Sequence, residues 1–228
     1  MNSPSIALSE HRYFSLVAVA VTATVLAGFI PLYTLRLLRH DPNLTLLVHA
    51  HGFVMTAWIG LFLTQTLLIS RHRIDLHRRL GIFGAGLAVL VLLVGMPTLV
   101  NAAARKSHDV HSTRFLWMLA AFDGLALVVF AGLVCASILL RGRGDYHKRL
   151  MLLGTLSLLG PAFGRLTEYA MRFRGNSDFA VLLLCAGTVL ACIAVDRVRS
   201  HRLHPAFIWG GACVIGMDLA TYLAKTML

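Results

Sequence analysis

The chain has 228 residues, of which 57% are hydrophobic and only 14% are charged, and its formal net charge is +11. With a mean hydropathy of +0.75, this composition excludes an ordinary soluble domain. Nearly every Lys and Arg falls in a short connection between apolar segments, so the positive charge indicates membrane orientation rather than nucleic-acid binding.

Seven apolar segments meet or approach the roughly 20 residues that a helix needs to cross a bilayer. They cover residues 13–35, 45–69, 79–101, 115–140, 149–171, 179–196 and 205–224. Short connections make successive helices antiparallel neighbours, and lipid offers the backbone no hydrogen-bond partners. The sequence therefore predicts an all-α protein with a single transmembrane domain over residues 1–228, built as helical hairpins.

The basic residues also predict the orientation of this bundle. With the N-terminus inside, twelve Lys and Arg residues lie on the inner side and eight on the outer side. This excess favours an N-terminus in the cytoplasm.

A basic hexapeptide occurs twice, as "DLHRRL" at residues 75–80 and "DYHKRL" at residues 145–150, and a looser junction runs from Asp196 to His204. The acids are positioned to cap a helix or to pair with an Arg four residues later, while the basic groups suit anionic lipid headgroups. Alternatively, the three junction histidines converge as metal or haem ligands. The residues concerned are Asp75, His77, Arg78, Arg79, Asp145, His147, Lys148, Arg149 and His204.

The second apolar segment carries a polar stripe. His51, Trp58 and Gln65 recur every seven residues and so share one helix face. His49 points almost opposite to His51, because two residues turn a helix by roughly 200°. The stripe fits either a buried, hydrogen-bonded histidine or a ligand site.

Ionisable residues inside apolar segments are costly and usually face the interior of a bundle. Asp123, Arg165 and Asp218 lie at compatible depths in the outer half, as does His51, with Glu168 closer to the surface. These residues form the predicted polar site, which binds a polar ligand, relays protons, or only locks the helices together. Gly160-Pro161 predicts a kink beside Arg165.

The outer loop "KSHDVHST" adds His108 and His111 on the same side as His49. This spacing is compatible with a surface metal site and equally with a solvated loop. The four cysteines have no C-x-x-C spacing and are expected to act as small packing residues.

The ordered set "HAHG", Trp58, Gln65, "HRRLG", "HKRLMLLG", "GPAFGR" and "HPAFIWGG" resembles a group of bacterial multi-pass membrane proteins of unknown function. The resemblance covers about residues 49–211. The chain is also distantly similar to predicted membrane families linked to the maturation of respiratory oxidases. The resemblance implies the bacterial inner membrane and a respiratory context, with other respiratory membrane proteins as partners, and it carries no catalytic residues.

Three functions remain open from the sequence. The first is a redox-associated membrane protein that binds b-type haem, a metal ion or a quinone-like ligand at its polar site. The second is a small proton-coupled carrier, and the third is a non-catalytic assembly or scaffolding factor. No motif of a soluble enzyme is present, so enzymatic activity is not expected.

Overall fold

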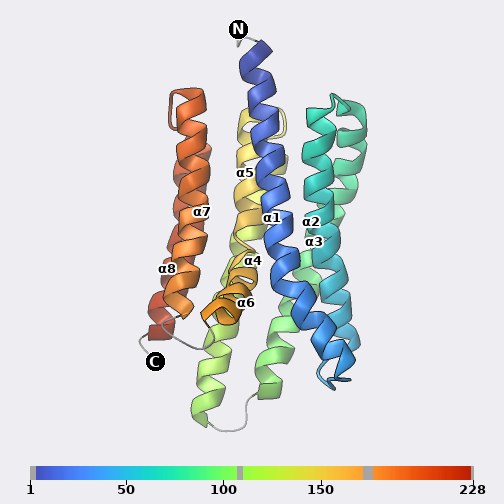
Figure 1. Cartoon of the computed structure of the whole chain (residues 1–228), viewed down its shortest axis with the longest axis vertical. Coiled ribbons are helices and arrows are strands. Elements are labelled where there is room, and N and C mark those ends of the chain that lie inside the picture. The colour runs from blue at the N-terminus through green and yellow to red at the C-terminus, as the bar shows by residue number, and fades with distance from the viewer. Residues whose placement is uncertain (1–3, 107–109, 172–176, 227–228) are drawn as a thin grey trace. The chain divides into compact units, whose positions relative to one another are not determined.

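The computed structural model describes residues 4–106, 110–171 and 177–226, with side chains described in 12–105, 123–170 and 177–226. All regular structure in these ranges is helical (Figure 1). The helices are α1 (Pro4–Leu38), α2 (Leu46–Ser70), α3 (Ile74–Lys106), α4 (Val110–Leu139), α5 (Gly144–Leu156), α6 (Gly160–Met171), α7 (Ser177–Ser200) and α8 (Pro205–Thr226). The predicted all-α class is confirmed for the described residues.

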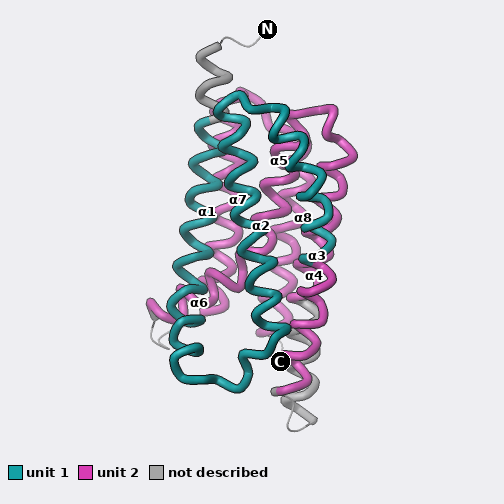
Figure 2. The backbone as a smooth tube through the Cα atoms, turned by 90° about the vertical axis from the view of Figure 1, so that its right-hand side faces the viewer, with its two compact units in different colours: residues 1–91 teal, residues 92–228 magenta. Residues whose placement is uncertain are grey.

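The helices are grouped in two compact units, Met1–Val91 (unit 1) and Leu92–Leu228 (unit 2), which Figure 2 colours separately. In unit 1, α1 packs against α2. In unit 2, α4 packs on α5 and α8, and α7 packs on α8 and α6. The single transmembrane domain expected from the sequence stays a prediction.

Most of the predicted spans correspond to helices long and apolar enough to cross a bilayer. Among the described residues, α1, α2, α3, α7 and α8 meet this condition, and the bent pair α5–α6 adds a sixth candidate. The assessed part of α4 runs only from Asp123 to Leu139, which is shorter than a full span. The membrane-type character is thus supported, while the count of seven and the orientation remain predictions.

The predicted kink in the fifth span is present as a break between two helices. α5 ends at Leu156, α6 begins at Gly160, and their axes differ by 45°. Pro161 has no backbone N–H and cannot continue the helical ladder through this turn. Ala162 and Phe163 instead both donate to the carbonyl of Leu159, which starts the second helix.

Both hexapeptides lie within helices, because α3 begins at Ile74 and α5 at Gly144. The apolar segments expected from the sequence began later, at residues 79 and 149, because the first turn of each helix is polar. α5 then approaches α8 closely at Gly210, where an added Cβ would lie 2.8 Å from a methyl carbon of Leu153. This approach holds the second hexapeptide against the start of α8.

Candidate functional site

The first polar cluster of unit 2 joins the start of α5 to the end of α7. Arg149 donates to both carboxylate oxygens of Asp196, from Nε over 3.1 Å and from Nη2 over 2.6 Å. The two side chains are only 4% and 5% exposed. A third donor, Nη1, reaches the main-chain carbonyl of Asp145 over 2.9 Å. This two-pronged geometry satisfies a buried guanidinium and a buried carboxylate together.

The same cluster continues to the start of α8. His204 Nδ1 accepts a hydrogen bond from the backbone N–H of Ala206 over 3.2 Å, as a helix cap does. That nitrogen therefore carries no proton, and Nε2–H donates to Asp145 Oδ2 over 3.0 Å. Tyr146 packs edge-on against the imidazole, with ring centroids 4.6 Å apart. We call Asp145, Arg149, Asp196 and His204 the junction cluster.

This pairing differs from the local pair expected within the hexapeptide. The Asp145 carboxylate bonds His204, and the Arg149 guanidinium bonds Asp196, 47 positions along the chain. Asp196 also lies inside α7 rather than ahead of a helix, so it does not cap one. The reason is burial, since a guanidinium 3% exposed within unit 2 needs a carboxylate brought to it by another helix.

The junction histidines of unit 2 bond to different groups. His147 Nδ1 lies 2.8 Å from Ser137 Oγ on α4, whereas His204 bonds Asp145. In unit 1, the His77 carbonyl accepts from Gln65 Nε2 over 3.2 Å. Within the described residues, no group of three or more His, Cys, Asp or Glu side chains is arranged to hold a metal ion. Lys148, the remaining junction residue of α5, is half-buried.

The second polar cluster of unit 2 lies toward the other ends of α7 and α8. Asp123 on α4 is within electrostatic range of Arg165 on α6 and Lys225 on α8. Lys225 Nζ also bonds Asp178 Oδ1, on α7, over 2.7 Å. Arg165 Nη1 donates to the carbonyl of Pro161 over 2.8 Å, at the broken helix.

Asp218 lies in the middle of α8, about two helical turns before Lys225. Its Oδ2 atom is buried and has no hydrogen-bond partner among the described residues. The carboxylate is near Cys185 on α7. Glu168 is exposed on α6, and its predicted depth close to the membrane surface stays a prediction. We call Asp123, Arg165 and Lys225, together with Asp218 farther along α8, the intramembrane cluster. That Asp218 and His51 form one site with Asp123 and Arg165 stays a prediction.

The fourth residue, His51, belongs to unit 1 and is half-buried on α2. Its stripe partner Trp58 is buried, with 3% of its surface exposed. The side-chain amide oxygen Oε1 of Gln65 has no hydrogen-bond partner among the described residues. His49 Nδ1 lies 2.8 Å from the Tyr33 hydroxyl of α1. His108 lies outside the described residues, and the side chain of His111 is likewise not described.

The first hexapeptide has no equivalent of the junction cluster. Asp75, Arg78 and Arg79 are all exposed, and none of them forms an ion pair with a described residue. The two copies are thus alike in sequence and opposite in environment. Sequence reasoning missed the partner of Arg149, although Asp196 continues the buried stripe of α7 through Cys185, Val189 and Cys192.

Comparisons with family models, with curated proteins and with solved structures find no match for this chain. The functional assignment consequently rests on the geometry of the two clusters in unit 2.

Proposed function

We propose that the chain is a seven-span protein of the bacterial inner membrane, with its N-terminus inside, that works as a small proton-coupled carrier. The single observation behind the proposal is Asp218, an acid in the middle of an apolar helix with a buried oxygen that lacks a donor among the described residues. A buried charged carboxylate is costly unless something compensates it. A proton or a cationic group of a ligand supplies that compensation.

The intramembrane cluster provides the other elements of such a site. Arg165 and Lys225 place positive charge near Asp123, so the cluster holds acids in two different surroundings. Fixed cations act on Asp123, whereas a buried oxygen of Asp218 has no donor among the described residues, so the two acids hold a proton with different strength. Proton relays in membrane carriers use intramembrane acids of this kind.

The break between α5 and α6 favours a carrier over a rigid scaffold. A discontinuous helix leaves backbone N–H and C=O groups without intrahelical partners inside the membrane. Carriers place their substrate and ion sites beside such breaks. Here the break is directly followed by Arg165, whose guanidinium bonds the carbonyl of Pro161. A bend of 45° also gives α6 a pivot relative to α5.

The decisive experiment measures proton movement in vesicles containing the purified protein and a trapped pH-sensitive dye. A potassium diffusion potential drives protons, with panels of small carboxylates, amines and amino acids added in turn. Proton flux above that of empty vesicles supports the carrier. A reduced-minus-oxidised absorption spectrum of the same sample tests the redox hypothesis, because a stoichiometric haem would assign the cluster to cofactor binding.

A further inference from the structure

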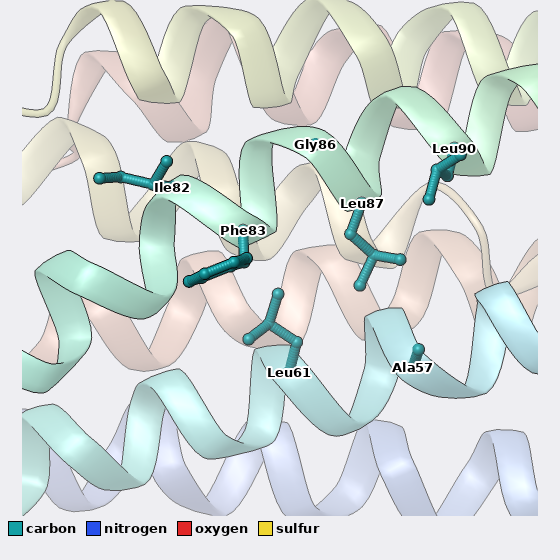
Figure 3. A pocket seen from close by; sticks show the side chains of 7 residues that line it. All are labelled: Ala57, Leu61, Ile82, Phe83, Gly86, Leu87 and Leu90. Atoms are coloured by element: carbon teal, nitrogen blue, oxygen red, sulfur yellow. The ribbon is translucent and has the colours of Figure 1, made fainter.

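The hairpin of α2 and α3 in unit 1 carries two adjoining surface features. A basic pocket of about 310 Å³ at the turn is lined by His72, Arg73, Ile74, Asp75, Leu76 and Arg79. An apolar groove of about 670 Å³ lies between the two helices. Phe83 and Leu87 of α3 point toward Leu61 of α2 across this groove (Figure 3).

The pocket and the groove lie along the same face of α3. Leu76 and Arg79 of the pocket are followed by Phe83, Gly86 and Leu90 of the groove, at steps of three or four residues. Such steps keep side chains on one face of a helix. A single elongated molecule can therefore occupy both features.

The dimensions match one phospholipid in one leaflet. From Arg79 to Leu90 the helix rises about 16 Å, at roughly 1.5 Å per residue. One leaflet contributes about 15 Å, half of a hydrocarbon core about 30 Å thick. The groove thus has the length of an acyl chain that starts beside the basic pocket.

The charge of the pocket selects the headgroup. Arg73 and Arg79 line it, are exposed, and have no ion pair with any described residue. In the second hexapeptide, the matching arginine is Arg149, which Asp196 neutralises. Asp75 is the single acid in the lining and forms no ion pair with either arginine, so the pocket keeps a net positive charge that suits a phosphate, which Arg is well shaped to hold.

We propose that the α2–α3 hairpin binds one anionic phospholipid, with its phosphate at Arg73 and Arg79 and an acyl chain along Phe83, Gly86 and Leu90. A second copy of the protein would leave the two arginines without a negative partner unless it brought acids. A phospholipid places its phosphate beside the arginines and its acyl chain in the groove. The proposal is independent of proton transport in unit 2.

Native mass spectrometry of the delipidated full chain in detergent tests the site, with added phosphatidylglycerol, phosphatidylcholine or inorganic phosphate. We expect one tightly retained phosphatidylglycerol, preferred over phosphatidylcholine. Arg73→Gln with Arg79→Gln should weaken phosphatidylglycerol binding about 30-fold, since each basic residue near an anionic lipid surface contributes roughly a fivefold effect. The matched control is Arg141→Gln with Arg143→Gln, two exposed arginines ahead of α5.

A second variant tests the groove separately from the charge. A Cβ added at Gly86 meets no atom within 4 Å, so we expect Gly86→Leu to fold normally while its side chain fills the open groove. We expect it to weaken both lipids at least tenfold, unlike the control Gly132→Leu, which also enters open space. Equal lipid binding by the variants and their controls would overturn the proposal. Displacement of the lipid by excess inorganic phosphate would also overturn it, because the pocket would then take a free anion.

Discussion

Replacing Arg149 by Met tests how strongly the junction cluster stabilises unit 2. The substitution removes both hydrogen bonds to Asp196 and leaves a carboxylate that is only 5% exposed without its cation. Removing one partner of a buried ion pair costs about 3–5 kcal/mol. The free energy of unfolding should fall by that amount, measured by SDS titration in mixed micelles and followed by circular dichroism.

Two further variants make the result interpretable. Arg149→Met combined with Asp196→Leu removes both charges and should recover most of the loss, because an apolar replacement of a buried pair is often neutral or stabilising. Asp178→Asn is the control, since the Asp178 and Lys225 side chains of this pair are 45% and 28% exposed and the pair should contribute at most about 1 kcal/mol. The reasoning is refuted if Arg149→Met costs no more than the control, or if the double variant loses the sum of the two single losses.

Two smaller predictions concern packing and pH. Gly210→Ala should cost about 1–3 kcal/mol of unfolding free energy in the same titration, because its Cβ would meet a leucine methyl carbon of α5 at 2.8 Å. Gly216→Ala, which enters open space, should cost little, and equal losses would contradict the contact. On the loop after α1, a backbone hydrogen bond from Asn43, followed by the guanidinium of Arg36, lowers the pKa of Asp41. The stabilisation by Asp41 is present above its unfolded pKa and is lost as pH falls through the lowered folded pKa. A carboxyl NMR titration showing the folded pKa at or above the ordinary value would refute this.

The helices were predictable because a bilayer imposes a length and a composition on every span. The broken fifth span also followed from the sequence, since Pro161 removes a backbone donor wherever it stands. The helix starts at Ile74 and Gly144 could not be predicted in the same way. The first turn of each helix is polar, and a search for apolar segments treats such residues as a loop.

The pairing within unit 2 was only partly predictable. Asp123 and Arg165 are within electrostatic range of each other, and the sequence suggested this pairing because both are ionisable residues inside apolar segments. The Arg149–Asp196 pair joins positions 47 residues apart, whereas local spacing suggested Asp145 as the partner. Two similar hexapeptides consequently differ in their surroundings, and the neighbouring helices decide which copy is neutralised.

The central claim is tested most directly by electrogenic proton flux into vesicles that contain the Asp218→Asn variant. This substitution keeps the shape of the side chain and removes the group that exchanges a proton. The account predicts flux for the unmodified chain and for Asp41→Asn, an acid on the connection between α1 and α2, and at least a tenfold loss for Asp218→Asn. Equal flux from Asp218→Asn and the unmodified chain, or no flux above empty vesicles with any compound tested, would contradict the assignment of proton-coupled transport to the intramembrane cluster.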